Sequence, residues 1–162
     1  MEIERKYLVN FLPEGYDACP FHEIEQAYLC TEPVIRIRKE DEEYYLTYKS
    51  KGLLVREEYN LELTGKAYAH LLEKADGMVL TKRRYRIPVE GTGFTAELDI
   101  FSGAYQGLML VEVEFETKEE ADEFQAPAWF GTDVTFSGEY QNSRLALQPD
   151  PKVIPVPPDP LR

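Results

Sequence analysis

Polar and apolar side chains alternate along several short segments of the chain, and Gly, Pro, Asp or Ser residues separate these segments. A period of two predicts β-strands, because successive strand residues point to opposite faces of a sheet. Strands are expected over eight segments: residues 2–9, 22–30, 34–39, 44–49, 54–63, 82–89, 94–102 and 108–116.

Three further segments favour helices. Thr64 precedes four apolar residues at helical spacing, and Gly77 is expected to end that helix. Thr117 and Glu120 have the spacing of a capping box, which predicts a second helix start. A third, short helix is expected over residues 142–147.

The alternation places charged side chains on one face of the predicted sheet. An antiparallel sheet with one solvated face gives the same alternation. Here, however, like charges are grouped within a strand, and such i, i+2 neighbours repel at a separation of about 7 Å unless an opposite charge lies between them. The grouped residues are Glu2 and Glu4, Arg36 and Arg38, Lys82 and Arg84, Glu97 and Asp99, and Glu112 and Glu114.

Eight antiparallel strands favour closure, because a closed sheet has no exposed edges. An eight-stranded barrel has an interior wide enough for side chains and one small ligand. The predicted fold is therefore mainly β (α+β): a closed eight-stranded antiparallel β-barrel, or tunnel, with a few flanking helices. The charged face becomes the lining of that tunnel.

Composition limits the setting and the partners. The 162 residues predict one domain over 1–147, followed by a Pro-rich tail over 148–162 that we expect to be disordered. Two cysteines, a charged amino terminus and the lack of long apolar runs predict a cytoplasmic protein without a membrane segment. A net charge of −12 argues against binding to long nucleic acid. A homodimer is compatible with the sequence.

Cations and carboxylates on the same tunnel wall suit a polyanionic ligand that arrives with a metal. Arg and Lys bind phosphoryl oxygens, while paired carboxylates hold Mg²⁺ or Mn²⁺. His22 and His70 lack metal-ligand spacing, so zinc is not expected. The chain has no Gly-x-x-x-x-Gly-Lys loop, so side chains must hold any bound phosphate.

The charged elements resemble, in order, those of the CYTH superfamily of triphosphate tunnel metalloenzymes. The resemblance covers about residues 1–147 and is closest to small bacterial inorganic triphosphatases. Its signature Glu-x-Glu-x-Lys is matched by Glu2, Glu4 and Lys6, and further matches follow along the strands. These are Arg36-x-Arg38, Lys49, Glu58, Lys82-x-Arg84, Glu97-Leu98-Asp99 and Glu112-x-Glu114.

The resemblance implies a barrel whose tunnel binds a triphosphate and hydrolyses it with Mg²⁺ or Mn²⁺. The implied metal ligands are Glu2, Glu4, Glu112 and Glu114, with Glu58 and Asp99 as further candidates. The implied phosphate-binding residues are Lys6, Arg36, Arg38, Lys49, Lys82 and Arg84. Lys6 and Tyr28 are the implied catalytic pair that helps to activate water.

Three positions depart from the family pattern. Asn60 stands where close relatives commonly have Glu, and Gln141 and Ser143 replace lysines that are frequent in the last helix.

The favoured reaction is hydrolysis of inorganic tripolyphosphate to pyrophosphate and phosphate. The alternatives are a nucleoside or thiamine triphosphatase, an adenylate cyclase of the same fold, and a polyphosphate-binding barrel without catalysis.

Overall fold

A computed structural model describes residues 1–148 and contains one antiparallel sheet. Three α-helices and two 3₁₀ turns (Tyr16–Ala18 and Gly103–Tyr105) accompany it within the described residues. The helices are α1 (Gly65–Leu72), α2 (Lys118–Glu123) and α3 (Asn142–Leu147). The strands are β1 (Glu2–Val9), β2 (Phe21–Thr31), β3 (Val34–Glu40), β4 (Glu43–Lys49), β5 (Val55–Arg56), β6 (Glu58–Glu62), β7 (Asp76–Pro88), β8 (Thr95–Ser102), β9 (Met109–Phe115) and β10 (Phe130–Asp133).

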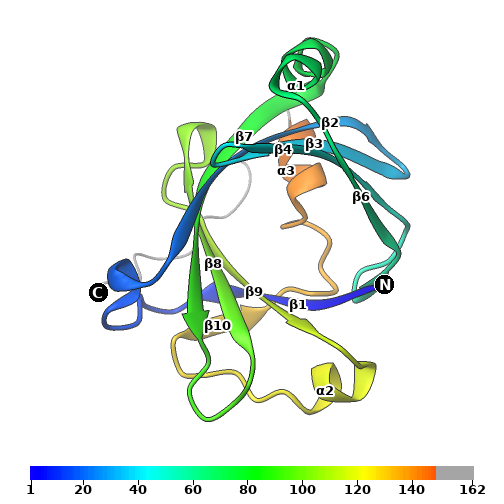
Figure 1. The fold of residues 1–162 in the computed structure, drawn as a ribbon. Helices are drawn as coiled ribbons and strands as arrows, with labels where there is room; N and C mark the ends of the chain where they lie inside the picture. The colour runs from blue at the N-terminus through cyan, green and yellow to red at the C-terminus, as the bar shows by residue number, and fades with distance from the viewer. Residues whose placement is uncertain (149–162) are drawn as a thin grey trace.

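The sheet curls into a nearly closed barrel (Figure 1). The strand order is β10-β1-β9-β8-β7-β2-β3-β4-β6, and β5 pairs with β1 on the side away from β9. Because β5 leads directly into β6, this segment connects the two ends of the sheet. The predicted antiparallel barrel is confirmed. Its wall has eight strand positions, one of which is divided between β5 and β6, and β10 is added beside β1.

The prediction of one continuous strand over residues 54–63 was wrong. Its first part, β5, pairs with β1, whereas its second part, β6, pairs with β4. Glu57 lies between them and exchanges hydrogen bonds with Ser50 through its backbone N–H and C=O groups. The chain therefore turns at Glu57 because the two halves of the segment serve opposite ends of the sheet.

The prediction that Gly77 ends the first helix was also wrong. Helix α1 begins after Thr64, whose side chain accepts a hydrogen bond from the Ala67 N–H group, but it ends at Leu72. Gly77 already belongs to β7, which begins six residues earlier than residue 82. Its φ of 68° and its approach to Ala146 explain the glycine: a Cβ there would lie 2.2 Å from the Ala146 carbonyl oxygen.

Strand β10 was not predicted. It has four residues without clear alternation, and it pairs with β1 through Tyr7–Asp133 and Val9–Phe130. Contacts distant in sequence hold it in place: the Arg5 guanidinium donates to the Asp133 carboxylate, and the Asn10 side chain donates to the Phe130 carbonyl. A local pattern does not contain this information.

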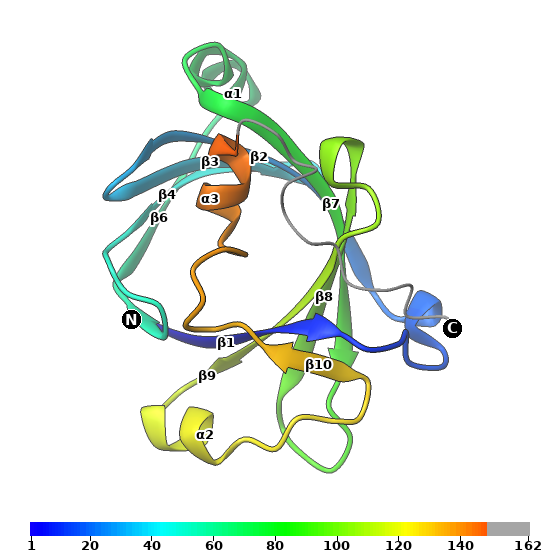
Figure 2. The ribbon, with the colours of Figure 1, turned by 180° about the vertical axis from the view of Figure 1, so that it is seen from behind.

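The helices cover different parts of the barrel. Helix α1 packs outside β3 and β4 through Tyr68, and α2 covers the outside of β1 and β9 through Ala121 (Figure 1). The capping box predicted at the start of α2 is present. Helix α3, predicted over residues 142–147, lies across one opening of the barrel (Figure 2), where Leu145 and Ala146 join an apolar cluster.

The barrel interior therefore has two zones, an apolar one around α3 and a charged one beyond it.

No helix among the described residues has the length and apolar composition needed to cross a bilayer. Of the tail predicted over 148–162, residues 149–162 lie outside the described residues.

Candidate functional site

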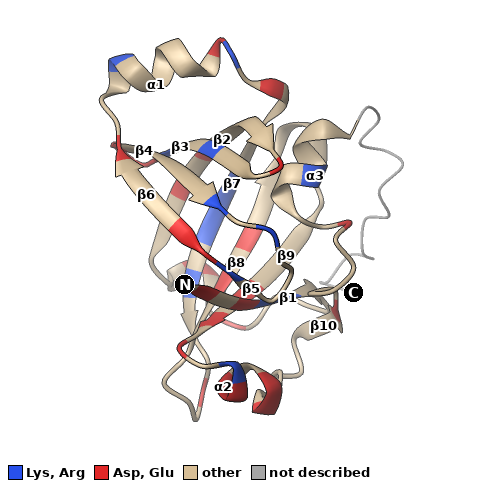
Figure 3. Ribbon diagram, turned by 90° about the vertical axis from the view of Figure 1, so that its right-hand side faces the viewer, with Lys and Arg blue, Asp and Glu red and all other residues tan. Residues whose placement is uncertain are grey.

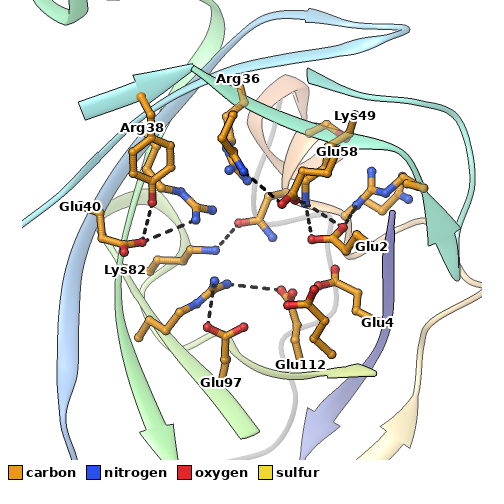
Figure 4. A pocket seen from close by; sticks show the side chains of 18 of the residues that line it. Glu2, Glu4, Arg36, Arg38, Glu40, Lys49, Glu58, Lys82, Glu97 and Glu112 are labelled. Atoms are coloured by element: carbon orange, nitrogen blue, oxygen red, sulfur yellow. Dashed lines mark hydrogen bonds and ion pairs between the residues drawn. The ribbon is translucent and has the colours of Figure 1, made fainter. Parts of the chain in front are cut away.

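A cavity of about 650 Å³ occupies the charged zone of the barrel. The alternation of each strand explains it, since every second residue of the strands points inward. The lining contains eleven of the thirteen predicted site residues; Tyr28 and Asp99 are not among them. Figure 4 shows the side chains converging from opposite walls. The lining residues are Glu2, Glu4, Lys6, Arg36, Arg38, Glu40, Glu43, Tyr44, Tyr45, Lys49, Arg56, Glu58, Asn60, Glu62, Lys82, Arg84, Glu97, Glu112, Glu114, Gln141, Asn142 and Ser143.

Arg36, on β3, is a buried guanidinium whose charge is not paired. It is 7% exposed, and its Nη2 donates a 3.1 Å hydrogen bond to Thr47 Oγ1. Within residues 1–148 no carboxylate forms an ion pair with it, and its Nε has no hydrogen-bond partner. Burial, together with the neighbouring charge of Arg38, lowers the pKa of Arg36 to about 10. An anion in the cavity would relieve this unfavourable burial.

Arg38 lies two residues further along β3 on the same wall. Its Nε and Nη2 donate to Gln26 Oε1 at 3.1 and 2.7 Å. Its only ion pair among the described residues is a long one, 3.7 Å from Nη1 to Glu40 Oε1. The two arginines of β3 thus form a cationic wall with little local neutralisation (Figure 4).

Lys82 and Arg84, on β7, are held by Asp99 of the adjacent strand β8. Asp99 is fully buried and accepts a bidentate pair from Arg84 Nε and Nη2 at 2.7 and 2.9 Å. Lys82 Nζ lies 2.8 Å from Asp99 Oδ2. Although burial opposes ionisation of Asp99, Arg84 and Lys82 hold its pKa below the usual range. Burial, opposed by Asp99, lowers the pKa of Lys82 to about 7.

Lys49, on β4, bridges two carboxylates from different strands. Its Nζ lies 3.1 Å from Glu2 Oε1 and 3.3 Å from Glu58 Oε2. Burial raises the pKa of Glu2. For Glu58, burial acts in the same sense but is outweighed by hydrogen bonding with Glu2 and by Lys49, which lower its pKa to about 2.

Glu4, on β1, lies among other carboxylates. It pairs in register with Glu114 of β9, next to the pair formed by Lys6 and Glu112. Burial and the charges of Glu112 and Glu2 raise the pKa of Glu4 well above its usual value. Glu112 is buried too, yet Lys6 and Arg84 hold its pKa well below the usual range. Burial and the charge of Glu58 raise the pKa of Glu114.

The two residues of the predicted catalytic pair have different hydrogen-bond partners. Lys6 Nζ donates to the Tyr140 carbonyl oxygen at 3.1 Å and lies 3.6 Å from Glu112 Oε1. The Tyr28 hydroxyl instead accepts a 3.0 Å hydrogen bond from Gln26 Nε2 and lies in the apolar cluster beside α3. Within the described chain no hydrogen bond joins Lys6 to Tyr28.

Three neutral residues of the site were not assigned a role from the sequence. Gln26 and Thr47 are fully buried and contact Arg38 and Arg36, and Asn142 accepts a 2.8 Å hydrogen bond from Lys82 Nζ. A signal existed, because the strand period places Gln26 and Thr47 on the inward face with the charged residues. The contact of Asn142 depends on where α3 docks.

These features define a class of protein: an antiparallel barrel whose interior is a charged cavity with a buried cationic wall. The chain belongs to the CYTH domain family, whose model matches residues 1–145. It is 40% identical over 152 residues to an inorganic triphosphatase of Nitrosomonas europaea, covering 90% of this chain and 97% of that relative.

Two further comparisons agree with this assignment. An inorganic triphosphatase of Acetivibrio thermocellus is 32% identical over 153 residues, covering 91% of this chain and 94% of the relative. A crystal structure of an inorganic triphosphatase superposes with a TM-score of 0.70 at 35% identity, covering 93% of this chain and 97% of the other.

Proposed function

We propose that this protein hydrolyses triphosphates and that its substrate is inorganic tripolyphosphate, converted to pyrophosphate and phosphate. The observation that carries the proposal is Arg36, a buried guanidinium on the cavity wall that forms no ion pair with any carboxylate of residues 1–148. A polyanion without an organic group suits a cavity whose walls are mostly charged. The names of the two curated relatives support the same substrate.

The cations of the cavity would bind the phosphoryl oxygens through charge-assisted hydrogen bonds. Arg36 and Arg38 lie on one wall, while Lys82 and Arg84 lie on β7 and Lys49 on β4. Linked phosphoryl groups can therefore contact several strands at once. Lys6, at the inner end beside Tyr140, is proposed to bind a terminal phosphoryl group.

The reaction requires no covalent intermediate. The oxygen of a water molecule forms a bond to the terminal phosphorus, and the bond from that phosphorus to its bridging oxygen breaks. Pyrophosphate leaves with the bridging oxygen, and the proton lost by the water passes to solvent or to a cavity carboxylate. Phosphoryl transfer depends mainly on positioning and on neutralisation of charge, which fixed cations supply.

The carboxylates fit a hard divalent cation such as Mg²⁺ or Mn²⁺. Glu4 is half-buried beside other carboxylates, and burial and the charges of Glu112 and Glu2 raise its pKa well above the usual value. Oxygen ligands in such a cluster are what these metals prefer. When bound, the cation neutralises negative charge on the phosphoryl oxygens.

We propose Glu2, Glu4, Glu58, Glu112 and Glu114 as the residues that hold the metal. Within residues 1–148 no three such side chains are already arranged as a metal site, so their side chains would have to adjust on binding. Both oxygens of Asp99 are engaged by Lys82 and Arg84, so we propose that Asp99 orients these cations.

The test is phosphate release from tripolyphosphate, pyrophosphate, ATP and thiamine triphosphate, each with Mg²⁺, with Mn²⁺ and with chelator. We expect the fastest release from tripolyphosphate with metal present. Arg36→Met should lose this activity, whereas Arg144→Met, which removes an exposed arginine outside the cavity lining, should keep it. Absence of release from tripolyphosphate with either metal would refute the proposal. Formation of a cyclic nucleotide from ATP would replace it with the cyclase alternative.

A further inference from the structure

Five cations of the cavity fall into two groups according to what orients them. Lys49, Lys82 and Arg84 are held by carboxylates: Glu2 and Glu58 hold the first, and Asp99 holds the other two. Arg36 and Arg38, both on β3, are held mainly by the uncharged side chains of Thr47 and Gln26, and Glu40 lies 3.7 Å from Arg38 Nη1.

The Gln26 amide is saturated by its contacts. Oε1 accepts from Arg38 Nε and Nη2, while Nε2 donates to the Tyr28 hydroxyl and, at 3.2 Å, to Asn142 Oδ1. A guanidinium only donates hydrogen bonds, so the amide oxygen must face Arg38. Gln26 lies directly opposite Arg38 in the pairing of β2 with β3, and this places the two side chains within hydrogen-bond distance.

The same residue connects Arg38 to a second strand. Asn142 Oδ1 accepts both from Gln26 Nε2 and, at 2.8 Å, from Lys82 Nζ. Strand β2 lies between β3 and β7 in the sheet, so Gln26 occupies the middle of this network. One neutral side chain thereby fixes Arg38 directly and, through α3, Lys82.

Thr47 acts in the same way from the other side of β3. Its hydroxyl accepts from Arg36 Nη2 and donates to Asn60 Oδ1 at 2.6 Å. Thr47 lies opposite Arg36 in the pairing of β3 with β4. Each arginine of β3 is therefore oriented by a fully buried neutral acceptor from the adjacent strand.

We propose that Gln26 and Thr47 are positioning residues that orient the β3 arginines without neutralising them, an inference that rests on the proposed triphosphate substrate. A carboxylate at either position would orient the guanidinium equally well but would compete with the anionic ligand. A neutral acceptor fixes the geometry and leaves the full positive charge for the phosphoryl oxygens. Gln26 and Thr47 therefore set the affinity for the triphosphate more than the rate of the bound complex.

The test compares KM and kcat for tripolyphosphate in Gln26→Glu, Thr47→Val and Thr47→Ser. Gln26→Glu keeps the acceptor for Arg38, adds a charge and replaces the Nε2 donor to Tyr28 and Asn142 by an acceptor. Thr47→Val keeps the shape and removes the hydroxyl. Gln26→Glu neutralises the charge of Arg38, and Thr47→Val removes a hydrogen bond to the charged Arg36. KM should therefore rise about tenfold or more in both variants. The kcat should change far less, as expected for interactions made equally in the ground and transition states.

Two variants serve as controls. Thr47→Ser retains the hydroxyl and should retain the wild-type KM. Gln106→Glu makes the same change of charge at an exposed position outside the cavity and should also be unchanged. Thermal melting shows which variants fold, and if Gln26→Glu does not fold, the contrast between Thr47→Val and Thr47→Ser decides.

A wild-type KM in both Gln26→Glu and Thr47→Val would overturn the inference and leave the proposed function intact. An equal loss in Thr47→Ser and Thr47→Val that follows their melting temperatures would also overturn it, because it would indicate packing alone. If the wild-type protein neither binds nor hydrolyses tripolyphosphate, the proposed function fails, and the inference fails with it.

Discussion

Strand geometry places Glu4 next to other carboxylates, although their like charges repel. The side chain is half-buried on the inward face of β1, where burial and the charges of Glu112 and Glu2 raise its pKa. An isolated protein gains nothing from such crowding, since like charges in a sheet repel. The crowding is explained if a cation belongs among these carboxylates.

Glu4→Gln should therefore abolish metal-dependent hydrolysis while leaving the metal-free protein at least as stable as wild type. The change removes a charged oxygen ligand and also one member of a repelling group. Activity assays and thermal melting in chelator measure the two effects. Glu119→Gln, at an exposed position of α2, controls for the loss of one charge and should change neither. Full activity of Glu4→Gln would remove Glu4 from the metal site.

Gly77 is a second position where one residue has consequences beyond its own strand. Its left-handed backbone and its contact with the Ala146 carbonyl allow α3 to pack closely against β7. Gly91 has a similar φ of 77°, but a Cβ there would meet no atom within 4 Å. Substituting each glycine in turn therefore distinguishes the cost of backbone strain from the cost of disturbing the packing of α3.

Gly77→Ala should destabilise the protein by more than Gly91→Ala, which should cost only the left-handed penalty of about 1–2 kcal/mol. Gly77→Ala should also raise KM for tripolyphosphate, because displacement of α3 moves Asn142 away from Lys82. Urea unfolding and steady-state kinetics measure both effects. Equal losses of stability in the two variants would mean that α3 does not depend on this close approach.

Among the elements, the alternation and the number of strands together predicted the barrel, because a closed sheet has no exposed edges and its charged face then lines a cavity. The same alternation correctly placed Arg36, Arg38, Lys82 and Arg84 on one face. It failed for β10 and for the turn at Glu57, where pairing between distant segments decides the structure. It also missed the roles of Gln26 and Asn142, since neutral side chains leave no charge pattern.

Strand β10 provides an element whose stability should depend on pH. The Asp133 carboxylate accepts from the Thr135 N–H at 2.9 Å and from the Thr135 hydroxyl at 2.6 Å, and it binds the Arg5 guanidinium. Burial would raise the pKa of Asp133, but the hydrogen bonds from Arg5 and Thr135 lower it below 3.8. A lowered pKa means that the carboxylate stabilises the folded state above its unfolded pKa and that this contribution is lost as pH falls through the folded value.

Asp133→Asn should therefore be less stable than wild type at pH 7, by about 1 kcal/mol. The difference should shrink when the pH falls below about 4, where the wild-type carboxylate becomes protonated. Urea unfolding at several pH values measures this difference. Asp122→Asn, at an exposed position of α2, should match wild type at neutral pH. A constant difference between Asp133→Asn and wild type across this range would contradict the assignment.

For the whole molecule, the contrast between the exterior and the cavity is decisive. The chain carries a net charge of −12, and α2 is one of its acidic segments (Figure 3). Most of the cations that line the cavity, in contrast, lie on the strands of the barrel. We therefore expect the acidic exterior to repel an extended polyanion and the cavity to admit a short phosphate chain.

The protein should accordingly bind tripolyphosphate more tightly than pyrophosphate and should not bind a short RNA. Pyrophosphate reaches fewer of the cations, and the RNA meets the acidic surface first. Competition by each compound against tripolyphosphate hydrolysis measures the order. Inhibition by RNA at concentrations as low as those of a triphosphate would contradict the separation of charge between surface and cavity.

If the buried arginines of β3 bind a triphosphate inside the barrel, calorimetric titration with tripolyphosphate should detect their contribution. Glu114→Gln, used in Mg²⁺ buffer to slow turnover, is compared with the same variant carrying Arg36→Met or Arg144→Met. We predict one tripolyphosphate bound per chain, with affinity at least about tenfold weaker only when Arg36 is replaced. Equal affinity with and without the Arg36 guanidinium would contradict the account.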